Sequence, residues 1–395
     1  MSKNINKELA PELRFPEFEN LTAWTVKPMK KLFKIGNGKD HKHLEDGNIP
    51  VYGSGGYMRS VSDYLYDGES ACIGRKGTID KPIFLSGKFW TVDTLFYTHS
   101  FENCLPKFIY LVFQNIDWRS QNEAGGVPSL SKANIEKIEV AVPSIDEQQK
   151  IADCLSSLDE LIVAHTQKHQ ALQSYKKGLM QNLFPADGET VPALRFPEFE
   201  NAGNWAAKSI GEIGEVVTGN TPNTSNRDYY GGNIMFASPA DISERRFVSK
   251  TSKTLSSEGL DIARKIPAHS ILFVCIGSTI GKVAQNAYEC ATNQQINVII
   301  PFDEYENSFV YYALDFHSSE IAELAGKQAV PIINKTLFSS SVLIVPPEKG
   351  EQQKIADCLS SIDEVITAQE LQIEVLKAHK KGLMQRLFPA VGETQ

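Results

Sequence analysis

Hydrogen-bond donors and basic side chains gather in two glycine-rich regions of this 395-residue sequence, in segments without helical periodicity. Arginine and lysine can neutralise phosphates or bind guanine edges, asparagine can pair with adenine edges, and glycine lets a backbone approach closely. Both regions could therefore contact DNA. The candidates in the first region are Lys39, Lys42, His43, Tyr57, Arg59, Arg75 and Lys76. The candidates in the second region are Asn223, Arg227, Tyr229, Arg245, Arg246, Ser278, Thr279 and Lys282. Water-exposed loops are rich in the same residue types, so each position fits a solvated surface as well as a DNA contact.

Motifs that would support catalysis are missing from the sequence. GSTIGKV, from Gly277, is one residue short of the GxxxxGK[ST] phosphate-binding loop, and Val283 replaces the hydroxyl that would bind magnesium. We therefore reject nucleotide binding there. No GxSxG, HExxH, GxGxxG or NPPY-like segment occurs, which leaves hydrolase, metalloprotease, dinucleotide-binding and adenine methyltransferase functions without support. We expect no catalytic residue and no cofactor in this chain.

The histidines and cysteines fit roles other than metal binding. His41 and His43 have no companion ligand at a suitable spacing, so contact with solvent or phosphate explains them better. His165 and His169 lie one turn apart on a predicted helix, where they fit polar positions in an apolar seam. The six cysteines form no CxxC pair, and we expect free, mostly buried thiols.

Composition indicates a globular protein with room for two or three domains, since 42% of the residues are hydrophobic. The net charge of −8 argues against a protein coated in nucleic acid, although local charge can override the total. No apolar run approaches the ~20 residues of a membrane span, and the first residues lack the apolar core of a secretory signal. We expect a cytoplasmic location and no membrane partner.

The sequence contains a two-fold repeat. EQQKIADCLSS occurs from Glu147 and again from Glu351, and each copy continues to KKGLMQNLFPA or KKGLMQRLFPA. LRFPEFEN occurs from Leu13 and from Leu194, each time followed by a tryptophan. The segments between these constant parts differ. The pattern indicates one scaffold that presents two different binding domains.

The constant segments are predicted helices, because apolar residues recur with alternating steps of four and three. The seam positions are Ile151, Leu155, Leu158, Ile162, Leu172, Leu179, Leu183, Ile355, Leu359, Ile362, Ile366, Ile373, Leu376, Leu383 and Leu387. Acidic residues are concentrated early in each helix and lysines late, so only antiparallel pairing sets acid against base. Such helices would span ~58 Å and hold the two variable domains apart. The alternative, in which each helix packs only on its own domain, remains open.

The variable segments predict mixed α/β domains with curved sheets, since short β-like runs are punctuated by glycine and a helix comes late in each, at 105–115 and 309–316. The expected organisation is a first domain at 1–145, a helix at 146–184, a linker with the second domain at 185–350, and a second helix at 351–389. The fold class is thus α/β (α+β) with an antiparallel two-helix coiled coil and pseudo-two-fold symmetry. The repeated segments also predict that the two chain ends meet.

These motifs resemble the specificity subunits of type I restriction-modification systems. The resemblance rests on EQQKIADCLSSLDELI and EQQKIADCLSSIDEVI, on KKGLMQNLF and KKGLMQRLF, and on GNIPVYGSGGY, VPSLSKANIEKIEVAVPSIDEQQ and GNTPNTSNRDYYGGNIMF. It covers nearly the whole chain. It implies two target-recognition domains, each of which reads one half of a bipartite, asymmetric site in double-stranded DNA, and helices that set the gap between the halves.

The resemblance also implies partners. Two modification subunits that bind S-adenosylmethionine would dock on this chain to methylate adenine, and restriction subunits that use ATP and magnesium would join for cleavage. Two readers at opposite ends of a rod would meet half-sites roughly one helical turn, ~34 Å, apart. A non-catalytic protein-interaction scaffold built on a coiled coil is the alternative, and an enzyme that acts alone on nucleic acid is a third class that needs a motif the chain lacks.

Overall fold

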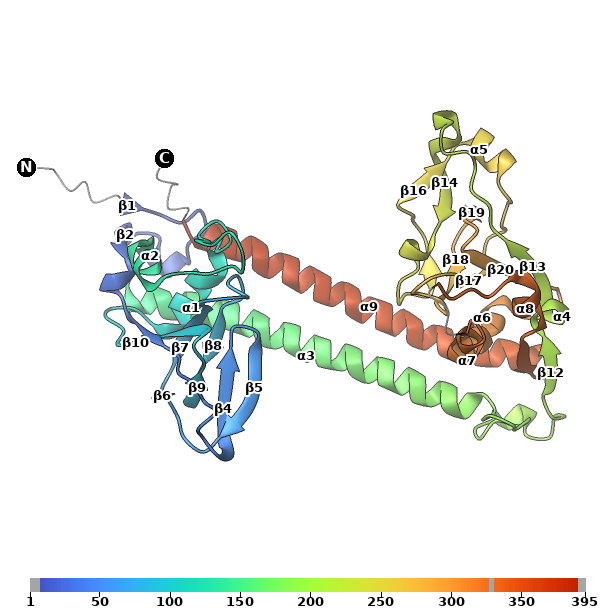
Figure 1. The fold of residues 1–395 in the computed structure, drawn as a ribbon, viewed down its shortest axis with the longest axis horizontal. Coiled ribbons are helices and arrows are strands. Elements are labelled where there is room, and N and C mark those ends of the chain that lie inside the picture. The colour runs from blue at the N-terminus through green and yellow to red at the C-terminus, as the bar shows by residue number, and fades with distance from the viewer. Residues whose placement is uncertain (1–7, 327–329, 390–395) are drawn as a thin grey trace, which may run out of the picture. The chain divides into compact units, whose positions relative to one another are not determined.

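The computed structural model describes residues 8–326 and 330–389. The chain divides into two compact units, one of residues up to 165 together with those from 373, and one of residues 166–372. Each unit combines a mixed α/β domain with parts of two long helices (Figure 1). The prediction of two mixed α/β domains is confirmed. In the described residues, no helix is both long and apolar enough to cross a membrane.

Three small sheets and two helices build the domain of the first unit. In spatial order the strands are β1 (Glu8–Leu9), β2 (Trp24–Pro28) and β11 (Glu139–Val142); β3 (Lys34–Asn37), β10 (Leu95–His99), β7 (Ser70–Gly74) and β8 (Ile83–Leu85); and β5 (Gly56–Val61), β4 (Asp46–Gly53), β9 (Lys88–Thr91) and β6 (Tyr66–Asp67). The helices are α1 (Pro106–Asn115) and α2 (Lys132–Lys137). The central strand β7 is buried along its whole length, in keeping with its nearly unbroken apolar sequence.

The domain of the second unit is built in the same way. Its strands are β12 (Ala206–Ser209) and β21 (Val342–Val345); β13 (Gly214–Thr218), β20 (Ile296–Pro301), β17 (Ile271–Val274), β18 (Val283–Asn286) and β15 (Phe247–Val248); and β16 (Lys253–Leu255), β14 (Tyr230–Ala237) and β19 (Cys290–Thr292). Its helices are α4 (Ile210–Ile213), α5 (Ser257–Ile262), α6 (Asn307–Phe316), α7 (Ser318–Glu323) and α8 (Lys335–Ser340).

The two domains share one topology. The order β13-β20-β17-β18 repeats β3-β10-β7-β8, and β16-β14-β19 repeats β5-β4-β9. Each domain also contains an equivalent pair of parallel strands, β4 with β9 in the first domain and β14 with β19 in the second. The divergent middles of the sequence therefore fold on one plan, as the shared order of predicted elements indicated.

Two helices of 39 residues carry the constant segments, α3 (Ile145–Leu183) and α9 (Lys349–Leu387). They begin one and two residues before the predicted starts and stop before Pro185 and Pro389, which cannot continue a helix. All of the predicted seam residues are buried or half-buried. Sequence analysis missed four further buried residues that face the same cores, Ala152, Met180, Ala356 and Met384.

Within each unit the two helices run antiparallel (Figure 1). In the first unit Leu155 of α3 shares a core with Leu387 of α9, and the Asp159 carboxylate lies 2.7 Å from the Lys380 ammonium. In the second unit the Lys176 ammonium lies 2.6 Å from the Asp363 carboxylate. The predicted pairing of acid against base is confirmed in both units. The alternative is partly true as well, because the start of α3 also packs into the core of the first domain.

The repeated LRFPEFEN segments are clamped to the starts of the long helices. Arg14 donates to both oxygens of Glu147, and the Trp24 indole donates to the same carboxylate at 3.1 Å. In the second unit Arg195 and Trp205 hold Glu351 in the same way. The acidic residue that was predicted to stabilise each helix start is therefore also one partner of an ion pair with the arginine of LRFPEFEN. This pairing explains why LRFPEFEN and EQQKIADCLSS are repeated together.

The following glutamine and lysine of each EQQK motif have matching partners. The Gln148 and Gln352 side-chain carbonyls accept from the backbone N–H groups of Leu105 and Glu306 at 2.8 and 2.9 Å. These contacts tie the starts of α1 and α6 to α3 and α9. The lysines pair with the glutamate of FPEF, Lys150 with Glu17 and Lys354 with Glu198.

The chain ends lie together in the first unit, as far as the described residues reach. The Leu13 N–H donates to the Arg386 carbonyl at 2.9 Å, and the Arg386 guanidinium lies 3.0 Å from the Glu12 carboxylate. Leu194 and Asn182 repeat the backbone contact in the second unit. The prediction that the chain ends meet is confirmed for the segments around Leu13 and Arg386, and residues 1–7 and 390–395 lie outside the described part of the chain.

Candidate nucleic-acid interface

Four loops converge in the first domain at the ends of β4, β7 and β9, at residues 53–56, 75–77, 92–94 and 127–130. We name them loop cluster 1. The Arg75 N–H donates to the Thr94 carbonyl at 2.8 Å, and the Gly77 N–H donates to the Pro128 carbonyl at 2.9 Å. Ser54 bridges two of the loops, since its hydroxyl donates to the Lys76 carbonyl at 2.8 Å. Backbone hydrogen bonds therefore hold the four loops as one surface.

The loop after β3 joins this cluster through a glycine. A Cβ at Gly38 would lie 1.9 Å from the Val92 carbonyl oxygen, so no other residue fits there. The next residue, Lys39, donates its N–H to the Thr91 carbonyl at 2.8 Å. This close approach places the exposed Lys39 side chain beside the cluster.

Basic side chains project from loop cluster 1. Arg75 and Lys76 are exposed and line a hollow of about 910 Å³ that is also lined by Asn37, Asp93 and Lys132. The Arg75 guanidinium lies 5.9 Å from the centre of the Phe96 ring. Burial lowers the pKa of the nearby His99, and the charges of Lys34 and Lys132 lower it further, as expected beside a positive surface. The hollow can thus attract phosphate and present an arginine to a base edge.

The remaining candidates of the first domain lie on the β3–β4 loop and the β4–β5 hairpin. Lys42 and His43 are exposed, and the His43 ring packs edge-on to Trp90. Tyr57 is 62% exposed, which suits stacking on a base. Arg59 differs from them, because its guanidinium lies 2.5 Å from the Asp46 carboxylate and is half-buried.

The second domain holds an equivalent surface, loop cluster 2, at residues 237–238, 275–281, 293–295 and 330–333. The Gly277 N–H donates to the Pro331 carbonyl at 3.1 Å and the Cys275 N–H to the Gln295 carbonyl at 2.8 Å. These bonds repeat those of Gly77 and Arg75 in the first domain. Gly219 repeats Gly38, since a Cβ there would lie 2.3 Å from the Asn293 carbonyl oxygen.

Amide side chains replace the basic ones in loop cluster 2. Gln294 is exposed, and the Thr221 hydroxyl donates to its carbonyl oxygen at 2.7 Å. The Asn293 amide donates to the Gln295 carbonyl oxygen at 3.0 Å. Ser278 is exposed and Thr279 half-buried on the adjacent loop. An oriented glutamine amide suits recognition of an adenine edge, whereas the Arg75 guanidinium of the first domain suits guanine.

Several candidates of the second domain point elsewhere. Arg246 donates to Gln285, Tyr312 and Ser360, and its guanidinium lies 4.9 Å from the Tyr312 ring centre, so it links the domain to α9. Arg245 pairs with Glu370 of α9 at 2.9 Å. Both arginines therefore have partners within the second unit, and their predicted contact with DNA stays a prediction.

The remaining candidates of the second domain lie in two places, Lys282 after loop cluster 2 and the other three on the loop before β14. Lys282 donates to the Ile242 carbonyl at 3.3 Å. Asn223 and Arg227 are exposed and Tyr229 half-buried on the loop before β14, where Arg227 lines a hollow of about 430 Å³. This loop lies outside loop cluster 2, so the structure brings together Ser278 and Thr279 but not the residues around Arg227.

Several side chains at these surfaces were not among the predicted candidates. They are Asp93 and Thr94 of loop cluster 1, the adjoining Lys132, and Asn293, Gln294 and Gln295 of loop cluster 2. One signal was present, because TVDT and TNQQ follow the equivalent strands β9 and β19. Their equivalence is visible only once the shared topology is known.

The site offers no machinery for catalysis in the described residues. No group of three histidine, cysteine, aspartate or glutamate side chains there could hold a metal ion. All six cysteines are free, and burial raises the pKa of Cys72 and Cys290 to about 12 and of Cys104 and Cys275 to about 11. Thiols with such pKa values are poor nucleophiles.

Comparison with known proteins identifies the duplicated architecture. The family model described as the type I restriction modification DNA specificity domain matches residues 22–174 and 202–377. The type I restriction enzyme HindI specificity subunit of Haemophilus influenzae is 25% identical over 315 residues, which cover 62% of this chain and 68% of that protein. The MjaVIII specificity subunit of Methanocaldococcus jannaschii is 23% identical over 345 residues, which cover 82% of this chain and 77% of that protein.

Solved structures share the fold. The S subunit of the type I restriction-modification system from M. genitalium superposes with a TM-score of 0.71 at 14% identity, and the match covers 97% of this chain and 100% of that one. A chain from a structure of an assembled type I restriction-modification system has a TM-score of 0.53 at 14% identity, over 93% of this chain and 98% of that one. At this identity the likeness concerns the fold alone, and it confirms the predicted fold class.

Proposed function

Because the chain belongs to the family of type I restriction-modification DNA specificity proteins, and is thus a non-catalytic specificity subunit that recognises DNA sequence, we propose that each of its domains reads one half of a bipartite, asymmetric site. The observation that carries this proposal is the pair of loop clusters. One framework, with its central strands repeated in the same order, presents different side chains at equivalent places. Two different readers imply two different half-sites.

The chemistry of the loop clusters indicates what each half-site contains. Loop cluster 1 presents Arg75 and Lys76, and Lys132 of α2 lines the same hollow; these side chains suit phosphates and a guanine edge. Loop cluster 2 presents Gln294 and Asn293, which suit adenine edges. We therefore expect a guanine in the half-site of the first domain and an adenine read by an amide in the half-site of the second.

The long helices are the proposed ruler and dock. In each unit, α3 and α9 pair antiparallel through apolar seams and partly exposed ion pairs, so each domain is joined to both helices. A helix pair of this kind would fix the gap between the half-sites. Its outer faces would bind two modification subunits, which carry S-adenosylmethionine for adenine methylation. Restriction subunits, with ATP and magnesium, would join the complex for cleavage.

The experiment is a genome-wide map of adenine methylation in a methylation-free host that expresses this chain with its cognate modification subunit. We expect one bipartite, asymmetric motif that disappears when this chain is omitted. Exchange of residues 24–142 for the equivalent segment of a relative with another target should change one half of the motif only. Exchange of residues 205–345 should change the other half.

Two further variants refine the map. Gln294→Ala should relax one position of the second half-site, and Asn201→Ala, an exposed residue outside loop cluster 2, is the matched control. A motif that survives both domain exchanges unchanged would contradict the proposal. So would an assembled complex that methylates adenine without sequence preference.

A further inference from the structure

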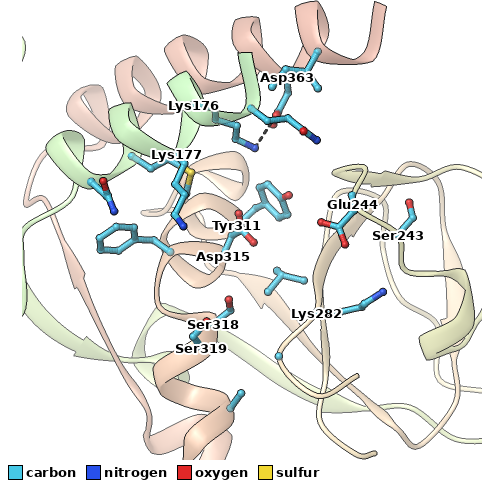
Figure 2. A pocket seen from close by; sticks show the side chains of 18 of the residues that line it. Lys176, Lys177, Ser243, Glu244, Lys282, Tyr311, Asp315, Ser318, Ser319 and Asp363 are labelled. Carbon is cyan, nitrogen blue, oxygen red and sulfur yellow. Dashed lines mark ion pairs between the residues drawn. The ribbon is translucent and has the colours of Figure 1, made fainter. Parts of the chain in front are cut away.

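The second unit contains a cavity of about 660 Å³ that borders loop cluster 2 at Ile280 and Gly281. Its walls are the last turns of α3, the helices α6 and α7, the loops around Glu244 and Lys282, and one face of α9 (Figure 2). Tyr311 and Asp315 of α6 form one of its walls. Glu244 faces them from the opposite side (Figure 2).

Two polar groups in this cavity lack partners. Tyr311 is 4% exposed, and its hydroxyl makes no hydrogen bond to any residue in the described part of the chain. Figure 2 shows this hydroxyl directed into the cavity. Within the same described part, the Asp315 carboxylate has neither a hydrogen bond nor an ion pair, and burial raises its pKa, an effect that the charge of Lys176 offsets only in part. The Asp315 side chain is half-buried, so both groups open onto the cavity, where a ligand could reach them.

The first unit provides an internal comparison. Gln148 and Gln352 bind the N–H groups at the starts of α1 and α6, which makes Tyr110 and Gln114 equivalent to Tyr311 and Asp315. The Gln114 amide donates to the Tyr110 hydroxyl at 2.6 Å, and Lys380 donates to the Gln114 carbonyl oxygen at 3.3 Å. In the first unit, the neutral Gln114 side chain fills this position and hydrogen-bonds its neighbours. In the second unit, the Asp315 carboxylate occupies the same position without such bonds.

A cationic partner fits these groups best. A neutral ligand would leave the half-buried Asp315 carboxylate without a counter-charge. Of the lysines that line the cavity, Lys176 is engaged with Asp363 at 2.6 Å and Lys282 with the Ile242 carbonyl at 3.3 Å, whereas Lys177 is exposed and forms no ion pair with Asp315. A guanidinium has planar, forked donors that match one carboxylate and can reach a hydroxyl and a second carboxylate at once. Asp315, Tyr311 and Glu244 present such a set of acceptors.

We propose that this cavity binds the guanidinium of an arginine side chain from the modification subunit, with Asp315 and Tyr311 as its acceptors. This inference rests on the proposed function, in which α3 and α9 dock that subunit, and these two helices form part of the cavity wall. The site makes the two repeats unequal as docking surfaces. One modification subunit would insert an arginine at the second unit, and the other would meet the closed network of the first.

The test uses the full chain and the variant Asp315→Gln, which restores the residue type found at the equivalent position of the first unit. This variant should fold, because its amide can bind Tyr311 and Lys176 as Gln114 binds Tyr110 and Lys380. We expect it to bind the modification subunit about 30-fold or more weakly at the second unit, since a charge pair is lost. Tyr311→Phe should weaken binding by a smaller factor. Asp303→Asn, an exposed change of the same charge, is the control.

A second measurement uses arginine amide as the probe, in titrations of the wild-type chain and of Asp315→Gln. Binding that the variant abolishes, together with weakened binding of the modification subunit, supports the inference. Binding of arginine amide without any effect of Asp315→Gln on the modification subunit would overturn the assignment to that partner in favour of a free small cation. If the wild-type chain and Asp315→Gln bind the modification subunit equally, and arginine amide binds neither chain, the inference about the cavity is wrong while the proposed docking function stands. If the wild-type chain does not bind that subunit, the proposed docking function fails instead.

Discussion

Arg14 donates two hydrogen bonds to the carboxylate of Glu147, from Nε to Oε1 at 2.8 Å and from Nη2 to Oε2 at 2.7 Å. The glutamate side chain is 1% exposed and lies at the start of α3. A buried carboxylate without hydrogen-bond donors would be strongly destabilising, so Glu147 depends on the donors that Arg14 supplies. The pair joins LRFPEFEN, which precedes the first domain, to the start of α3, which follows it. It thereby holds the first domain against α3.

Arg14→Leu should lower the free energy of unfolding of the first unit by about 3 kcal/mol, because it leaves Glu147 buried and unpaired. Urea unfolding followed by tryptophan fluorescence measures the change, since the Trp24 indole donates to Glu147 at 3.1 Å. Arg119→Leu breaks an ion pair with Asp80 on the surface and is the control, with little expected effect. An equal response of the two variants would contradict the structural role of Arg14.

Leu359→Ala should destabilise the second unit by about 2–5 kcal/mol, because Leu359 is fully buried where α9 meets α3 and the domain core. Trp205 lies in the same core, so its fluorescence during unfolding reports the loss. Leu371 of the same helix is 48% exposed, and Leu371→Ala should change the stability far less. Similar losses for the two leucines would show that the seam does not hold the helices together.

Lys76→Ala and Gln294→Ala should affect DNA binding of the assembled complex in different ways. Lys76 is exposed in loop cluster 1, and its loss should weaken binding to all sequences and reduce the slope of log affinity against log salt by about 0.9. Gln294→Ala should leave that slope unchanged and cost about 1–3 kcal/mol of discrimination at one base pair.

Binding titrations at several salt concentrations, with the cognate site and with sites altered at single positions, separate the two effects. Lys30→Ala, at an exposed lysine outside loop cluster 1, is the control for charge. The assignment of loop cluster 2 to base reading would be wrong if Gln294→Ala weakened all sites equally.

Insertion of one heptad into both long helices tests the proposed ruler. The ion pairs of Asp159 with Lys380 and of Lys176 with Asp363 define the register, which matches an insertion after Ile162 in α3 to one after Leu376 in α9. Seven residues keep the seam in phase and add about 10 Å. The methylation map should show a gap longer by about three base pairs, with both half-sites unchanged. An unaltered gap would show that the helices do not set the spacing.

The sequence predicted those parts of the structure that depend on local pattern or on repetition. The seam residues of α3 and α9 follow from their spacing, and the antiparallel direction follows from the charges at Asp159, Lys176, Asp363 and Lys380. The clamp of Arg14 on Glu147 was missed, because 133 positions separate the two residues and no local pattern reports such a contact.

Individual site residues were harder to predict. Arg246 has the residue type of a DNA contact, yet Gln285, Tyr312 and Ser360 bind its guanidinium, and all three come from distant parts of the sequence. Gln294 carried no signal of its own. It becomes a candidate only because the topology places it where Asp93 and Thr94 stand in the first domain. Loop side chains thus acquire their roles from the framework that carries them.

The unpaired Asp315 should make the stability of the free chain depend on pH. Burial raises its pKa above the ordinary value of 3.8, and the negative charges of Asp363 and Glu244 raise it further, whereas Lys176 lowers it. The native chain then holds a proton at Asp315 more tightly than the unfolded chain does. The free energy of unfolding should therefore fall as the pH rises from the ordinary carboxylate range through the raised pKa, and the loss is complete above it.

Asp315→Gln removes this titration, so the variant should gain stability over the wild type as the pH increases. Urea unfolding of both chains between about pH 4 and about pH 8, with Trp205 as the reporter, measures the difference at each pH. Asp303→Gln, at an exposed aspartate, should show no such trend. A difference between wild type and Asp315→Gln that is constant across this range would mean that Asp315 titrates normally in the free chain. Saturation with the modification subunit should remove the trend from the wild type, because a bound guanidinium would stabilise the ionised carboxylate and return its pKa toward or below the ordinary value.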